Sequence, residues 1–209
     1  AVIGTLALLL AAPAGRAEPG AEAVLAAQPP DLVRTLLESK AVLAGRAEGS
    51  SQTAQGFVIF ERPVERVYRL LSQTTRQREY RPELEAIETA RQLEDGSIDE
   101  HHLKIMFIGI RYRLRNRWDP AHRRISWELD PEFANALRRV DGSWELFALD
   151  ASRTLGVLTT KVEVGAGMPS FLQDYVTRKN LPNTLERCRH WVDADGHLDE
   201  GVGGADDRL

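Results

Sequence analysis

The sequence predicts an α+β domain in which a curved antiparallel sheet of about seven strands wraps around a long C-terminal helix. The first observation is that residues 84–164 read as one strand after another, with turn residues such as Asp95 and Gly96 between them. The second is that apolar residues at helical spacing occur before this run and again in residues 168–192. The third is the single cysteine, Cys188, in 209 residues, which excludes an internal disulfide and leaves the packing of one core to stabilise the fold.

The domain is expected to begin with a helix and a strand. Residues 31–45 carry apolar side chains at helical spacing behind Asp31, a good N-cap residue, which predicts a short amphipathic helix. A polar link over 46–52 follows it. Residues 53–61 then alternate between apolar and polar side chains, as a half-buried strand does.

A second helix is predicted in RPVERVYRLL, residues 62–71, with Pro63 at its first position. Its buried face is expected to carry Val64, Val67, Tyr68 and Leu71. The polar segment 74–84 contains a proline and predicts a short helix or turn around Tyr80.

The stretch IRYRLRNRW, residues 110–118, places an arginine at every second position. Side chains alternate between the two faces of a strand, so Arg111, Arg113, Arg115 and Arg117 share one face while Ile110, Tyr112, Leu114 and Trp118 share the other. We interpret the arginine face as the solvated side of the sheet, paired across strands with Glu100, Glu128 or Glu145. The alternative is a docking surface for anionic lipid headgroups or an acidic partner. The formal net charge of −4 argues against nucleic acid, so we expect no nucleic-acid partner.

The last predicted element is a long helix over residues 168–192 that Pro182 should bend near Leu181. Its apolar stripe includes Phe171, Leu172, Tyr175, Leu185 and Cys188. The Gly- and Asp-rich residues 194–209 are expected to be a disordered tail.

The N-terminal residues suggest export. Residues 1–17 contain an apolar run followed by Gly15-Arg16-Ala17, which is typical of a signal peptide, here truncated at its start. A buried core helix is the alternative interpretation. Residues 18–30 would be a linker and residues 31–193 the folded domain, and we expect a periplasmic or secreted protein.

Four segments carry a resemblance to a known family: RPVERVYRLL, REYRPEL, GSWELFAL and GMPSFLQDYVTRKNLPNTLERCRHWV. From about Asp31 to Val192 the sequence resembles the START-like helix-grip superfamily of polyketide cyclase/dehydrase and lipid-transport proteins, nearest to its coenzyme Q-binding group. The resemblance implies a helix-grip fold, a cavity for a hydrophobic ligand, and no bound metal or other cofactor.

One long helix cannot fill the concave side of a curved sheet, so we expect a cavity between the sheet and the C-terminal helix. Aromatic side chains on the inward face suit a flat or isoprenoid ligand, and His101 has the inward parity to be a polar group in the cavity. Asn116 and Thr159 could orient a ligand carbonyl or satisfy a neighbouring backbone group. The predicted cavity residues are Tyr80, His101, Tyr112, Leu114, Trp118, Trp127, Trp144, Phe171, Leu172 and Tyr175.

These features favour an exported binding protein that sequesters or carries a lipid, quinone or polyketide-like molecule, with no catalytic residues assigned. A metal site is not expected, since the adjacent His101 and His102 leave opposite faces of their strand. The alternative is a cyclase or hydrolase that uses His101, Tyr112 or Tyr175 as acid or base. A third hypothesis is an interaction module, in transient contact with anionic membrane through the arginine face.

Overall fold

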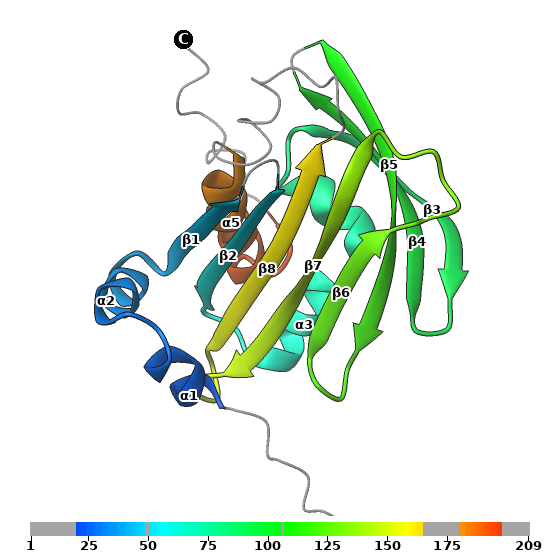
Figure 1. The fold of residues 1–209 in the computed structure, drawn as a ribbon. Coiled ribbons are helices and arrows are strands. Elements are labelled where there is room, and N and C mark those ends of the chain that lie inside the picture. Colours follow the sequence, from blue (N-terminus) through cyan, green and yellow to red (C-terminus); the bar gives the residue numbers. More distant parts are fainter. Residues whose placement is uncertain (1–19, 49–50, 106, 165–179, 198–209) are drawn as a thin grey trace, which may run out of the picture.

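The computed structural model describes residues 20–48, 51–105, 107–164 and 180–197. These residues form one antiparallel sheet with helices on both faces (Figure 1). The helical elements are α1 (Ala21–Ala26), α2 (Pro30–Ser39), α3 (Val64–Leu71), η1 (Thr74–Glu79, a 3₁₀ helix) and α5 (Asn180–Asp193). The strands are β1 (Ala41–Glu48), β2 (Ser51–Phe60), β3 (Leu84–Leu93), β4 (Gly96–Ile105), β5 (Ile108–Asp119), β6 (Arg124–Leu129), β7 (Leu137–Ala148) and β8 (Thr154–Val164).

The eight described strands lie in the order β1-β2-β8-β7-β6-β5-β4-β3, and every neighbouring pair is antiparallel. From β3 to β8 each strand pairs with the next one along the chain, as the short connections predicted. The predicted fold class, a curved antiparallel sheet with a C-terminal helix, is therefore confirmed. The sheet has one strand more than the expected seven, and the extra strand is β1.

The first predicted helix was extended too far. Helix α2 ends at Ser39 because Lys40 adopts a left-handed conformation with φ 65° and donates its N–H to the carbonyl of Leu36. Residues 41–48 then run antiparallel to β2, from Ala41 opposite Val58 to Glu48 opposite Ser51. The helix predicted over 41–45 is wrong, and so is the polar link at 46–48 and 51–52, because the open edge of β2 offers backbone partners that outweigh local preference. Residues 49 and 50 lie outside the described part of the chain.

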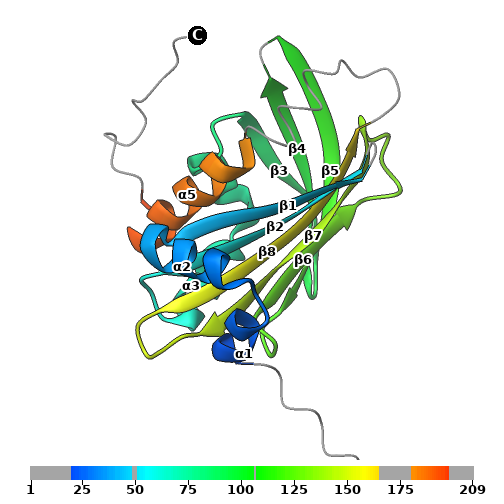
Figure 2. The same cartoon turned by 60° about the vertical axis from the view of Figure 1, so that its left-hand side comes forward.

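Alternation along β2 separates two cores. Val58 and Phe60 point toward α3 and α5, where they join Val67, Leu70 and Trp191 in one buried cluster. Figure 2 shows α3 and α5 together on one side of the sheet.

The opposite face of β2 and β8 is covered by α1 and α2. Phe57 and Ile59 pack there with Leu36 of α2 and Ala21 of α1. Helix α1 thus lies within the residues 18–30 expected to be a linker, and its first residue belongs to the core.

The described part of helix α5 runs from Asn180 to Asp193 and contains Pro182 near its start. Its buried face carries Leu185, Cys188, Trp191 and Val192. The part of the predicted helix over 168–179 lies outside the described residues, so the bend near Leu181 stays a prediction.

The residues directly after α5 are packed onto the domain. The Arg76 guanidinium donates from Nη2 to the carbonyl of Gly196 at 2.6 Å, and Arg66 donates from Nε to Asp195 Oδ1 at 2.6 Å. The prediction of a disordered tail from residue 194 is therefore wrong for residues 194–197, because these side chains supply partners for them. Residues 198–209 lie outside the described part of the chain.

The arginines of β5 lie on the outer face of the sheet. Glu100 of β4 accepts hydrogen bonds from Arg111 Nε at 3.0 Å and from Arg113 Nε at 2.9 Å. Arg124 and Glu145 pair across β6 and β7 at 3.0 Å. The predicted pairing of the β5 arginines is confirmed for Glu100, whereas Glu145 pairs with Arg124 of β6 and no ion pair of Glu128 is found within the described ranges.

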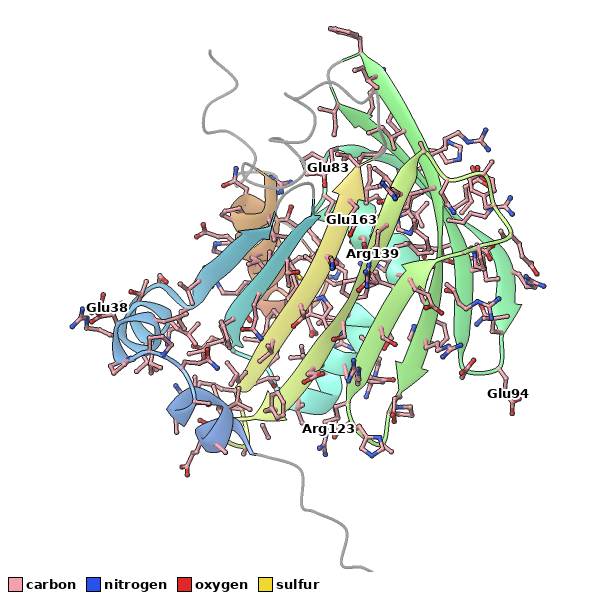
Figure 3. The ribbon with its side chains drawn as sticks, in the orientation of Figure 1. Glu38, Glu83, Glu94, Arg123, Arg139 and Glu163 are labelled. Atoms are coloured by element: carbon pink, nitrogen blue, oxygen red, sulfur yellow. The ribbon has the colours of Figure 1, made fainter. Side chains whose placement is uncertain are left out.

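Figure 3 labels Arg139 of β7 and Glu163 of β8, which occupy paired positions of the register, while the ion pair of Arg139 is with Asp141 of its own strand. On β4, the hydrogen bond from Arg111, and to a lesser extent that from Arg113, lowers the pKa of the Glu100 carboxyl to about 2. Burial of the carboxyl opposes this shift. The outer face of β4 and β5 is therefore held by charged pairs.

Candidate ligand-binding cavity

A cavity of about 170 Å³ lies between the concave face of the sheet, η1 and α5. For comparison, a cavity of about 150 Å³ can hold benzene, and pockets for drug-sized ligands span about 300–1,000 Å³. The space therefore suits one small ring system or one section of a longer molecule. Its described lining residues are Gln77, Tyr80, Arg81, Leu103, Tyr112, Leu114, Asn116, Trp127, Leu137, Val140, Trp144, Leu158, Thr160, Val162, Leu181, Thr184, Leu185 and Cys188.

Strand register brings the wall residues together. Trp144 of β7 lies opposite Leu158 of β8, and Asn116 of β5 lies opposite Trp127 of β6, so the inward positions of four strands form one continuous surface. Gly142 is also inward, and a Cβ there would come within 2.6 Å of the Trp127 ring. The glycine therefore lets the indole lie flat against the sheet.

Five of the predicted cavity residues line this space: Tyr80, Tyr112, Leu114, Trp127 and Trp144. Phe171, Leu172 and Tyr175 lie outside the described residues. The other two, His101 and Trp118, are described and are placed differently.

His101 points inward from β4 but does not reach the described cavity wall. Its ring stacks on that of Tyr112, with centroids 5.0 Å apart and planes inclined by 13°, and the residue is 1% exposed. Trp118 instead packs against the core beneath α3, because β5 carries its far end away from the cavity. Strand parity gave the direction of both side chains, but parity does not show how far along the strand the cavity extends.

The prediction that Thr159 points inward is wrong. Thr160 lines the cavity, whereas Thr159 borders a groove on the outer face with Ser126 and Ser143. Asn116 is inward as expected, but its Nδ2 donates to Asp99 Oδ2 at 2.8 Å and to Ser97 Oγ at 3.2 Å. Its amide hydrogens are therefore already used within the protein.

Asp99 is a fully buried carboxylate next to the cavity wall. Besides Asn116, Thr89 Oγ1 and Ser97 Oγ each donate to it at 2.9 Å, and Thr74 Oγ1 makes a further hydrogen bond. These four donors replace the water that the carboxylate loses on folding. The cluster ties η1 to β3, β4 and β5, which fixes the segment that carries Tyr80 and Arg81.

Arg81 is the charged side chain among the described lining residues of the cavity. Its Nε donates to Glu83 Oε1 at 2.9 Å, and its Nη1 donates to Gln77 Oε1 at 3.3 Å. Burial alone would lower the pKa of the guanidinium, but the Tyr112 hydroxyl and the Glu83 carboxylate outweigh it and raise that pKa above its usual value. The cavity thus contains a permanent cation.

The sequence offered one signal for this residue. Arg81 lies in REYRPEL, directly after Tyr80 and two positions before an acidic residue. Only the tertiary structure shows that the residues directly after η1, which include Arg81, turn toward the concave face of the sheet.

The other titratable groups among the described lining residues are neutral. Burial raises the pKa of the Cys188 thiol to about 12 and raises the pKa values of the Tyr80 and Tyr112 hydroxyls. A thiol in this state is a poor nucleophile, since the thiolate is the reactive form. These groups can donate or accept a hydrogen bond, but they carry no charge at neutral pH.

His101 is a weak base in this position. Burial, and then the nearby Arg81 charge, lower the pKa of the imidazole to about 3. Neither ring nitrogen has a hydrogen-bond partner among the described residues. No group of three His, Cys, Asp or Glu side chains that could hold a metal ion occurs in the described part of the chain.

Comparisons with known proteins identify the fold. No family model matches the sequence, and no curated protein matches it. The Zhui aromatase/cyclase from a Streptomyces species is similar in structure, with TM-score 0.61 and 20% identity, covering 74% of this chain and 99% of that one.

Two further solved structures have the same fold. A START superfamily protein from Mycobacterium smegmatis has TM-score 0.57 and 15% identity, covering 68% of this chain and 97% of that one. A STAR-related lipid transfer protein from Xanthomonas axonopodis has TM-score 0.57 and 16% identity, covering 73% of this chain and 93% of that fragment. The chain therefore has the START-like helix-grip fold that the sequence motifs indicated.

Proposed function

We propose that the protein binds a hydrophobic small molecule in the cavity between the sheet and α5, and sequesters or carries it. The observation that carries this proposal is the composition of the cavity wall. Leucine, valine and tryptophan side chains form most of it, and Arg81 is the one cation among its described lining residues. Burial of apolar ligand surface would supply about 25 cal/mol for each Å² removed from water.

The arrangement of the wall favours an amphipathic ligand. Trp127 and Trp144 offer flat apolar surfaces, which suit a ring or an isoprenoid unit. The Arg81 guanidinium, with the Tyr112 hydroxyl beside it, suits a carbonyl, phenolic or carboxylate oxygen. A quinone such as coenzyme Q, a lipid or a polyketide combines these features, and a long ligand would place only one section in the described space.

Binding is favoured over catalysis by the state of the polar groups. The cyclase or hydrolase alternative gives an acid or base role to His101, Tyr112 or Tyr175. His101 does not line the described cavity and its imidazole has a pKa of about 3, so it is a poor base at neutral pH. Tyr112 does line the cavity, but burial raises its pKa and keeps it protonated, which suits a hydrogen-bond donor.

We also propose that the protein is exported, on the signal-like pattern of residues 1–17. Sequencing of the N-terminus of the protein isolated from its own cells would test this. A mature chain beginning at Glu18 supports export, whereas a chain that keeps residues 1–17 and fractionates with the cytoplasm contradicts it.

Two neighbouring threonines of β8 give a matched test of the binding site. Thr160 lines the cavity and Thr159 faces the other side of the sheet. The probe is 1-naphthol, which has two fused rings and one hydroxyl, and its affinity is measured by isothermal titration calorimetry. An indole at Thr160→Trp fills the cavity and should weaken binding at least about tenfold, while Thr159→Trp should leave it unchanged.

The affinities of the two variants and of the unmodified protein decide whether the cavity is a binding site. Equal weakening by both variants, or no binding by the unmodified protein at millimolar probe, would contradict a binding site in this cavity. Circular dichroism of both variants checks that the sheet is intact.

A further inference from the structure

The turn between β4 and β5 holds an aromatic ring in solvent. Phe107 lies in this turn and is 80% exposed. Leu37 of α2, at 53%, is the other exposed large apolar side chain among the described residues. Figures 1 and 2 both show the β4–β5 hairpin projecting beyond the ends of β7 and β8, so Phe107 belongs to a protruding edge of the molecule.

Apolar residues connect this tip to the cavity. Ile105 pairs with Ile108 directly behind the turn, and Leu103 pairs with Ile110 two positions further in. Ile105 and Ile110 are buried in the same cluster as Leu103, which lines the cavity. Buried apolar side chains therefore line the two strands from the cavity wall to the turn that carries Phe107.

Cationic side chains flank the tip. The Lys104 side chain is 53% exposed and the Arg111 side chain is 62% exposed. Lys104 lies opposite Gly109, two residues from Phe107, and Arg111 lies four residues from it, so at about 3.3 Å per residue they begin about 7 and 13 Å behind Phe107. Lys104 pairs with Glu85 and Arg111 with Glu100, and the long side chains leave both cations at the surface. An apolar ring ahead of two cations matches a bilayer, in which the acyl region lies beneath a layer of phosphate groups.

We propose that the β4–β5 hairpin is a membrane-docking element: Phe107 inserts among lipid acyl chains while Lys104 and Arg111 meet anionic headgroups. One protruding ring covers too little area for a stable protein interface, which buries about 800 Å² on each partner, whereas a bilayer accepts a narrow wedge. Docking by this tip would place the cavity beside the lipid phase. The inference concerns a surface separate from the ligand site, and it can fail or hold independently of ligand binding.

Vesicle co-sedimentation of the full chain tests the proposal. With vesicles of equal parts phosphatidylcholine and phosphatidylglycerol, Phe107→Ser should weaken binding roughly tenfold, because partial burial of a phenyl ring is lost. Leu37→Ser removes the other large apolar side chain that is exposed among the described residues, and this variant should bind like the unmodified protein. Failure of the unmodified protein to sediment, or equal binding by Phe107→Ser, would overturn the docking element and leave a protein partner as the alternative use of the tip.

A fluorescent label reports insertion directly. The only native cysteine, Cys188, is buried, so an environment-sensitive nitrobenzoxadiazole label attached to Phe107→Cys reports on the tip alone. Its emission should rise on addition of the same vesicles, while the label at Leu37→Cys should not respond. An unchanged signal at both positions would exclude insertion. Unaltered circular dichroism and urea denaturation of the serine variants show that the fold is intact.

Discussion

The guanidinium of Arg81 and the carboxylate of Glu83 meet at 2.9 Å at the edge of the cavity, with the Arg81 side chain 24% exposed and that of Glu83 only 3% exposed. Glu83 Oε2 is buried without a hydrogen-bond partner among the described residues, so the carboxylate depends strongly on this one cation. The pair therefore couples the stability of the domain to the polar end of the proposed ligand site.

Removal of the cation should destabilise the fold. Arg81→Met leaves the Glu83 charge buried and unpaired, and we expect it to lower the free energy of unfolding by about 3 kcal/mol. The double variant Arg81→Met/Glu83→Gln removes the uncompensated charge and should recover most of this loss. Urea denaturation measures both. A double variant no more stable than the single one would show that the ion pair is not the cause.

The Arg81 charge should also select among ligands. The double variant Arg81→Met/Glu83→Gln is expected to be stable enough for binding measurements. Its affinity for 1-naphthoate should fall at least about tenfold, because a charge-assisted hydrogen bond is lost. Affinity for naphthalene, which has no polar atom, should stay within about twofold. Calorimetric titration of the two compounds gives the comparison, and a parallel loss of both would argue against contact between Arg81 and the ligand oxygen.

His101 should make the native state sensitive to acid. Burial lowers the pKa of its imidazole from 6.5 to about 3, so the unfolded chain binds the proton more readily than the native chain between these values. The stability associated with neutral His101 is complete above pH 6.5 and is lost as the pH falls toward 3. At pH 4 the loss relative to pH 7 should be about 2 to 3 kcal/mol.

The variant His101→Phe keeps a ring against Tyr112 and removes the titration. The stability difference between variant and unmodified protein should be small at pH 7 and should grow in favour of the variant as the pH falls to 4. Urea denaturation over this range is the measurement, and other acidic groups cancel in the difference. A difference that does not change with pH would contradict a neutral buried imidazole.

The Asp99 cluster should be a major source of rigidity around the cavity. Asp99→Ala leaves the buried donors of Thr89, Ser97 and Asn116 without their acceptor, and we expect a loss of about 3 kcal/mol in the free energy of unfolding. Thr89→Val removes one donor and should cost about 1 kcal/mol. Thermal and urea denaturation would measure both changes. Equal effects of the two substitutions would show that the carboxylate is not the centre of the cluster.

The fold was predictable from the sequence wherever alternation or turn residues were strong. Strand β5 over Ile108–Asp119, strand β8 over Thr154–Val164 and the turn before Gly96 follow the apolar and polar pattern directly. Strand β1 was not predictable, because AVLAGRAE has no alternation and forms a strand only through pairing with β2. Long-range pairing decides such segments, and no local pattern records it.

The same limit applies to the cavity. Parity placed Tyr112, Leu114, Trp127 and Trp144 on the inward face, and all four line the cavity. Parity could not show that the Tyr112 ring separates His101 from the described wall, or that Arg81 turns inward after η1. Those positions depend on the packing of η1 against β3 and β4, which the Asp99 hydrogen bonds fix.

The most direct measurement is a crystal structure of the protein with 1-naphthol. Binding in the proposed site predicts electron density for the fused rings against Trp127 and Trp144, with the hydroxyl within hydrogen-bond distance of Arg81 or Tyr112. Rings bound only on the outer surface, or a cavity that stays closed at saturating probe while the side chains of Trp127 and Trp144 fill it, would contradict the account.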